Sequence, residues 1–211
     1  VGQVFDEAPS VTLTDGQQAA HQAILGNRLR LALDQELAAD VTGEARLASP
    51  ALVWDTAIGQ STVVTQHVKA NLFYRGLAFR RMPALGDTLT TVTTIDGLRE
   101  NTRKPGRPPT GLAALHIVTT DQHDRPVLDF WRCAMLPLSG DDASPGPRDD
   151  LDDIGRGPST ADAGPAIAHW RLDRFRRRVG GPHFDDLRVA HADALGAEDH
   201  RLQAGAADLV D

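Results

Sequence analysis

The 211-residue chain has little of several residue types, and each shortage excludes a class of protein. Its single cysteine, Cys133, cannot form an intrachain disulfide, which is typical of a protein in a reducing cytoplasm. No segment approaches the roughly 20 apolar residues of a membrane-spanning helix, and no basic stretch followed by an apolar run opens the sequence. The eight histidines show no metal-ligand spacing. We therefore expect a cytoplasmic protein without a membrane span or a bound metal.

Positive charge is also scarce, because 22 Lys and Arg residues stand against 29 Asp and Glu residues, a net charge of −7. This balance argues against non-specific binding to nucleic acid or to an anionic membrane. The basic residues are nevertheless clustered locally, at Arg75, Arg80, Arg81, Arg99, Arg103, Lys104 and Arg107. A local basic strip in an acidic protein suits a small phosphorylated ligand, although a solvated surface would have the same composition.

The first predicted helix begins with a recognisable capping sequence. Thr14 and Gln17 have the spacing of a capping box, in which each side chain accepts a hydrogen bond at the start of the helix. The helix is expected over residues 16–25 and to end at Gly26, which adopts the left-handed conformation easily.

A second helix is predicted over residues 50–65. Ser49 is expected to supply the cap, and Pro50 needs no N–H at the first helical position. Apolar residues then recur near helical spacing and give the helix one apolar face. This segment is the best candidate for a central helix wrapped by a curved sheet.

Strand signals dominate from residue 68 to residue 136. Residues 71–87 are predicted to hold a strand, a turn at Pro83 and the Gly-Asp that opens a second strand. Residues 87–95, 114–119 and 127–136 are rich in β-branched residues or alternate between apolar and polar side chains. An Asp-rich turn at residues 121–124 joins the last two strands, and a long basic loop at residues 101–109 precedes the third. The order of a helix followed by long antiparallel strands predicts an α+β protein.

The chain divides by composition into three parts. Residues 1–139 carry the predicted helices and strands, whereas residues 140–164 are loaded with Asp, Pro, Gly and Ser and predict a flexible acidic linker. Order resumes after residue 165, but residues 165–211 are too few for a second domain of the same size.

Several segments resemble the MaoC-like acyl-CoA hydratase and dehydratase family, and within it the mesaconyl-CoA hydratase (β-methylmalyl-CoA dehydratase) group. The matching segments are residues 2–5, 21–24, 54–61, 71–77, 86–89 and 127–137, and residues 170–187 resemble the opening of the family's second half. The resemblance implies a hot-dog fold, with a curved antiparallel sheet around a central helix, in residues 1–139. It also implies that residues 165–211 are the incomplete start of a second hot-dog unit.

The resemblance implies a hydro-lyase that reversibly hydrates a mesaconyl-CoA-like 2-enoyl-CoA, with coenzyme A as part of the substrate and no other cofactor. Family hydratases carry an Asp–His dyad for general acid–base work. Asn27 and Ala32 occupy the two dyad positions in this chain, and neither side chain is a base. Three explanations stay open: a fragment of a longer enzyme, a short protein with a dyad-bearing partner, or a catalytically silent hot-dog that binds an acyl thioester or supports a partner subunit.

Few residues remain as site candidates. His21 is a candidate base, although a histidine at a helix surface or core edge is commoner. Arg75, Arg99 and Arg103 are predicted to bind the phosphates of coenzyme A, because guanidinium groups pair with phosphate oxygens. We also expect hot-dog units to pair, either between copies of this chain or with a partner subunit, since a single sheet leaves an open edge.

Overall fold

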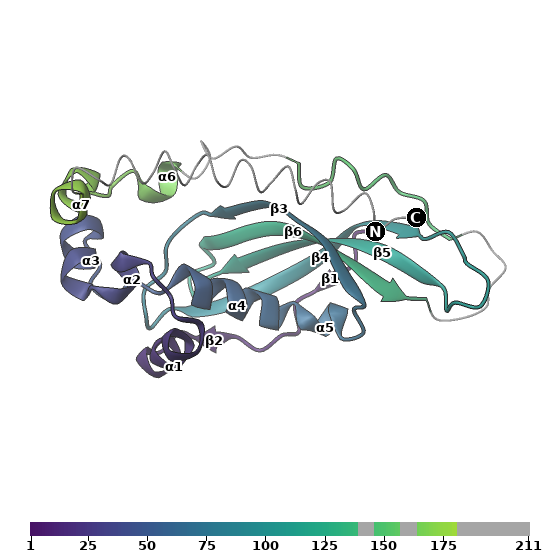
Figure 1. Ribbon diagram of the computed structural model, residues 1–211, viewed down its shortest axis with the longest axis horizontal. Coiled ribbons are helices and arrows are strands. Elements are labelled where there is room, and N and C mark those ends of the chain that lie inside the picture. The colour runs from purple at the N-terminus through teal and green to yellow at the C-terminus, as the bar shows by residue number, and fades with distance from the viewer. Residues whose placement is uncertain (139–145, 157–163, 181–211) are drawn as a thin grey trace. The chain divides into compact units, whose positions relative to one another are not determined.

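A computed structural model describes residues 1–138, 146–156 and 164–180 (Figure 1). The strands are β1 (Val4–Phe5), β2 (Val11–Thr12), β3 (Ala70–Phe79), β4 (Thr88–Glu100), β5 (Thr110–Thr120) and β6 (Pro126–Pro137). The helices are α1 (Asp15–Leu25), α2 (Arg30–Leu33), α3 (Gln35–Thr42), α4 (Pro50–Gln60), α5 (Thr62–Thr65), α6 (Gly164–Ile167) and α7 (Leu172–Val179). The chain separates into two compact units, Val1–Trp170 and Arg171–Asp211.

The strands of the first unit form one antiparallel sheet in the order β1-β4-β5-β6-β3, with β2 paired to β4. Strand β4 is rich in Thr, Val and Ile, and its first half alternates buried with partly buried residues, whereas residues on both faces of β5 are buried in its first half. The turn between β5 and β6 is closed by Asp121, whose carboxylate accepts hydrogen bonds from the backbone of His123 and Arg125. The four long strands and this turn confirm the predicted order of elements.

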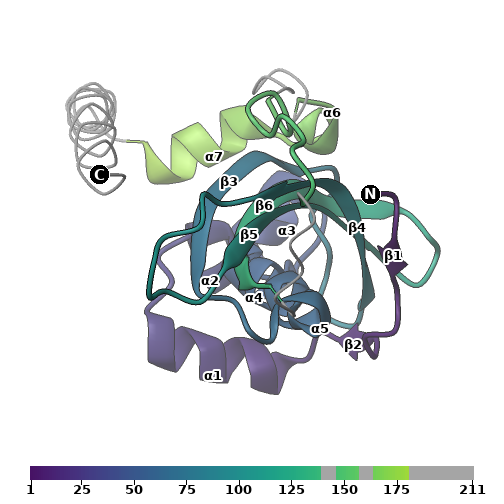
Figure 2. The same cartoon turned by 90° about the vertical axis from the view of Figure 1, so that its right-hand side faces the viewer.

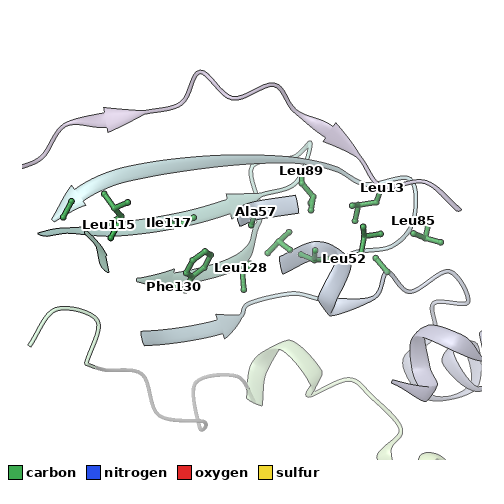
Figure 3. Packing of buried hydrophobic residues seen from close by; sticks show 14 residues of the cluster. Leu13, Leu52, Ala57, Leu85, Leu89, Leu115, Ile117, Leu128 and Phe130 are labelled. Carbon is green, nitrogen blue, oxygen red and sulfur yellow. The ribbon is translucent and has the colours of Figure 1, made fainter. Parts of the chain in front are cut away.

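Helix α4 packs on the inner face of the sheet, which curves around it (Figure 2). Leu52, Val53 and Ala57 of this helix are buried against a layer of sheet residues that includes Ile117 and Phe130 (Figure 3). The core is built mainly from Leu, Val, Ile and Ala with few aromatic rings, as the composition indicates. The central helix inside a curved antiparallel sheet confirms the predicted hot-dog fold.

The helix starts differ from expectation at one point. The capping box of Thr14 and Gln17 and the left-handed Gly26 are present as predicted. Ser49 does not cap α4, because its hydroxyl instead accepts a hydrogen bond from the side-chain amide of Asn27 at 2.6 Å. The expected single helix over residues 50–65 is two helices, since α4 ends at Gln60 and α5 begins at Thr62.

A short segment, residues 146–156, packs on the outer face of the sheet; we call it the strap. Its Leu151 is buried, and a side chain at Gly97 would collide with Leu151 and Ile154. Gly155 has a positive φ of 68°, and a Cβ there would lie 2.7 Å from that of Trp131. Part of the predicted flexible linker is therefore a packed layer, because two apolar side chains in an otherwise polar segment suffice to anchor it.

The second unit is described only through α7. This helix places Arg177 beside Asp173 at 2.8 Å, an i,i+4 ion pair on its surface. The predicted start of a second hot-dog unit is residues 165–211, of which residues 181–211 lie outside the described residues, and the domain boundaries stay a prediction. Among the described residues, no helix has the length and apolar character needed to cross a membrane.

Candidate functional site

The alternation of side chains along β3 and β6 divides the candidate residues between the two faces of the sheet. Arg75 is paired in register with Trp131, and Tyr74 with Arg132. Because neighbouring residues of a strand point to opposite faces, Arg75 belongs to the strap-covered outer face and Tyr74 to the inner face that holds α4. The register thus decides which arginine can meet a ligand in the interior of the hot-dog.

The Arg75 guanidinium is hydrogen-bonded to the backbone of the strap. Its Nη1 lies 3.1 Å from the carbonyl oxygens of Leu151, Asp152 and Ile154, and its Cζ lies 3.8 Å from the centre of the Phe73 ring. These carbonyls occupy the Nη1 donors of a guanidinium that the sequence assigned to a phosphate. The role of Arg75 in ligand binding stays a prediction, and its contacts indicate a structural role.

The other two predicted phosphate ligands lie on or beside the outer face. Arg99 of β4 pairs in register with Leu112. Burial raises the pKa of the Cys133 thiol, and the nearby charges of Arg99 and Arg75 lower this pKa by a smaller amount. Arg103, in the loop after β4, donates to Glu100 at 2.6 Å, and this hydrogen bond lowers the pKa of that carboxyl. Arg75 and Arg99 therefore share a neighbour, whereas Arg103 is held separately.

The segment from Asn27 to Ala32, which includes the two family dyad positions, is held in place by hydrogen bonds between uncharged groups. The side-chain amide of Asn27 donates to Ser49 and accepts from the backbone N–H of Leu29. Gln22 donates to the carbonyl of Asn27 at 2.9 Å, and Gln18 donates to that of Ala32 at 3.3 Å. The Asn27 amide thus has a positioning role, and no group in this network accepts a proton near neutral pH.

A carboxylate–imidazole pair lies beside this network, because His21 directly precedes Gln22 on α1. His21 of α1 is hydrogen-bonded through Nε2 to Asp55 of α4 at 2.9 Å, although the two residues are 34 positions apart in the sequence. The His21 side chain is only 12% exposed, whereas that of Asp55 is 49% exposed. The arrangement is that of a histidine oriented by a carboxylate, which is the minimum for acid–base work.

The outer face carries a second histidine pair, which the sequence did not predict. His116 is hydrogen-bonded to Asp129 at 2.7 Å and stacked on Trp131 with ring centres 4.0 Å apart. Burial raises the pKa of Asp129, but hydrogen bonds from His116 and Arg80 outweigh it and leave the pKa lowered. The same Arg80 and Asp129 line part of a hollow of about 470 Å³, where the carboxylate already balances the guanidinium.

One inner-face residue was missed altogether. Arg132 of β6 is 4% exposed and follows Leu128 and Phe130 on the face that builds the core. The signal was available, since a strand that alternates Leu, Phe and Arg puts a cation where the pattern requires an apolar side chain. Within the described part of the chain, no group of three or more His, Cys, Asp or Glu residues could hold a metal ion.

The fold and the comparisons with known proteins define the class. No family model matches the chain. A conserved hypothetical protein from Mycobacterium tuberculosis, essential for bacterial survival during infection and with a double hot-dog fold, superposes with a TM-score of 0.79 at 62% identity, over 87% of this chain and 56% of that one. A putative MaoC domain protein dehydratase from Chloroflexus aurantiacus gives a TM-score of 0.59 at 27% identity, over 77% and 48%.

A comparison of sequences finds a related enzyme. The β-methylmalyl-CoA dehydratase of Chloroflexus aurantiacus is 31% identical over 137 residues, which is 64% of this chain and 38% of that protein. The chain is thus similar to MaoC-like dehydratases and has the hot-dog fold. It spans 38% to 56% of the length of these three relatives.

Proposed function

We propose that this chain is the acyl-thioester-binding half of a MaoC-type hydro-lyase that reversibly hydrates a mesaconyl-CoA-like 2-enoyl-CoA. The match of 137 residues to a β-methylmalyl-CoA dehydratase carries the proposal. Coenzyme A enters as part of the substrate, and the reaction needs no further cofactor.

The chemistry requires groups that this half does not offer at the family positions. Water adds its oxygen to C3 of the enoyl group and a proton is delivered to C2, while a backbone N–H polarises the thioester carbonyl. Asn27 and Ala32 move no proton. We infer that a second hot-dog unit supplies the dyad, in line with the double hot-dog of the mycobacterial relative, of which this chain covers 56%.

A second candidate function is a silent hot-dog that binds an acyl thioester or supports a partner subunit. The neutral network around Asn27 favours it, because the amide is already committed to Ser49 and Leu29. This function differs from the first only in what the neighbouring unit contributes.

Hydration of crotonyl-CoA and mesaconyl-CoA tests the first proposal. Since general acid–base groups each contribute about 10²–10⁴-fold, the chain alone should turn over near background. The chain continued into a second hot-dog unit, with the arrangement of the mycobacterial double hot-dog, should be active. Turnover by the chain alone that is lost in both His21→Ala and Asp55→Asn would instead place the acid–base pair in this chain. Inactivity of the extended protein, with binding retained, would favour the silent function.

A further inference from the structure

A buried arginine stands on the inner face of the sheet with neutral partners. Arg132 is 4% exposed; its Nε donates to the side-chain oxygen of Asn71 at 2.8 Å, and its Nη1 lies 3.5 Å from the Ser61 hydroxyl. The Tyr74 ring lies 6.0 Å from its Cζ. In the described part of the chain, no carboxylate forms an ion pair with Arg132.

A buried guanidinium such as that of Arg132 lowers the stability of the protein unless an anion pairs with it. A guanidinium has five N–H donors, and the two acceptors that Arg132 meets, Asn71 and Ser61, are neutral. Burying a cation with neutral partners alone costs free energy that a matching anion would recover. The donors that remain are arranged as a planar fork, the geometry that binds two oxygens of a carboxylate.

The strand that pairs with the Arg132 segment lies at the edge of the sheet. Strand β3 is the last strand of the described sheet, and Tyr74 on it is exposed. The Trp54 ring lies 5.3 Å from that of Tyr74 and 4.6 Å from that of Phe130, so three aromatic rings cluster on the inner face that also carries Arg132. An aromatic cluster beside one buried cation is the kind of surface that suits a short acyl chain with a terminal charge.

We propose that Arg132 binds the free carboxylate of a dicarboxylic acyl thioester and thereby selects acidic over neutral acyl groups. The inference rests on the proposed function, in which the chain binds a coenzyme A thioester. A carboxylate is favoured over a phosphate because Arg132 is almost fully buried, and a compact planar anion reaches a buried fork more easily than a phosphate ester does. This assigns the coenzyme A phosphates to other residues.

Two saturated thioesters test the assignment without any turnover. Succinyl-CoA and butyryl-CoA have the same chain length, and only succinyl-CoA carries a terminal carboxylate. Calorimetric titration of the chain should show tighter binding of succinyl-CoA by about 10-fold or more, the effect of roughly 1.5 kcal/mol from a charge-assisted hydrogen bond. Arg132→Met should abolish this preference and leave butyryl-CoA affinity unchanged, and Arg132→Lys should keep part of it.

Arg80→Met is the matched control, because Arg80 directly follows β3 and is partly buried, but it is paired with Asp129. It should keep the wild-type preference. Equal affinity of the wild-type chain for the two thioesters, or a preference that survives in Arg132→Met, would overturn the role of Arg132 and leave the proposed function standing. Binding of neither thioester would contradict the proposed function and this inference together.

Discussion

Replacing Arg75 with alanine separates a structural role from a ligand-binding role. Its Nη1 contacts three carbonyls of the strap at 3.1 Å, but two hydrogens allow about two full hydrogen bonds. At about 1 kcal/mol net each, with about 0.5 kcal/mol for the contact with Phe73, the loss should be about 2.5 kcal/mol. For a chain of this size the melting temperature should fall by about 5–10 °C.

Thermal unfolding and amide hydrogen exchange in residues 146–156 are the measurements. Arg103→Ala is the control, because Arg103 is half-exposed and its ion pair with Glu100 is expected to contribute less than about 1 kcal/mol. An Arg75→Ala protein as stable as this control, with unchanged exchange in the strap, would refute the structural role. A loss of acyl-CoA affinity in that stable variant would restore the sequence-based prediction of phosphate binding.

Three further outcomes are expected. Gly155→Ala should destabilise the protein by about 2 kcal/mol or more, because its φ is 68° and its Cβ would collide with the tryptophan beneath it, whereas Gly16→Ala, with open space around it, should be neutral in urea unfolding. Burial raises the pKa of Asp121, but backbone and arginine hydrogen bonds outweigh it and lower the pKa to about 2 from 3.8. The stabilisation by the Asp121 carboxylate is therefore complete above pH 3.8 and is lost as the pH falls toward about 2. The melting temperature of Asp121→Asn should depend less on pH across this range than that of the wild type. An equal pH dependence of the two proteins would refute the stabilising role of this carboxylate. Lysine at both Leu72 and Leu77, exposed on the terminal strand β3, should weaken association of the chain in light scattering, and a wild-type monomer at micromolar concentration would contradict pairing through this edge.

Local chemistry made much of the fold predictable. The capping box at Thr14 depends on residues three positions apart, and the strands are marked by runs of β-branched residues, so both were visible in the sequence. Ser49 was misjudged as a cap because its partner, Asn27, is 22 residues away. A cap preference is a local property, and a tertiary hydrogen bond can displace it.

The candidate site was less predictable because it depends on register and on distant pairs. The bulges of β3, between Asn71 and Phe73 and between Arg75 and Ala78, help decide which face each side chain takes, and composition does not reveal them. The sequence therefore predicts that Arg75 binds a ligand, whereas its guanidinium contacts carbonyls of the strap. The strap escaped prediction because an acidic segment with only two anchoring apolar residues has no periodicity.

Calorimetric titration of the isolated chain with crotonyl-CoA measures the thioester binding that the proposed function requires. We expect saturable binding of the thioester that weakens with salt, because the phosphates of coenzyme A are charged, with no accompanying loss of the enoyl absorbance. Absence of any binding at concentrations that saturate a known MaoC-type hydratase would show that the chain is not the thioester-binding half of such an enzyme.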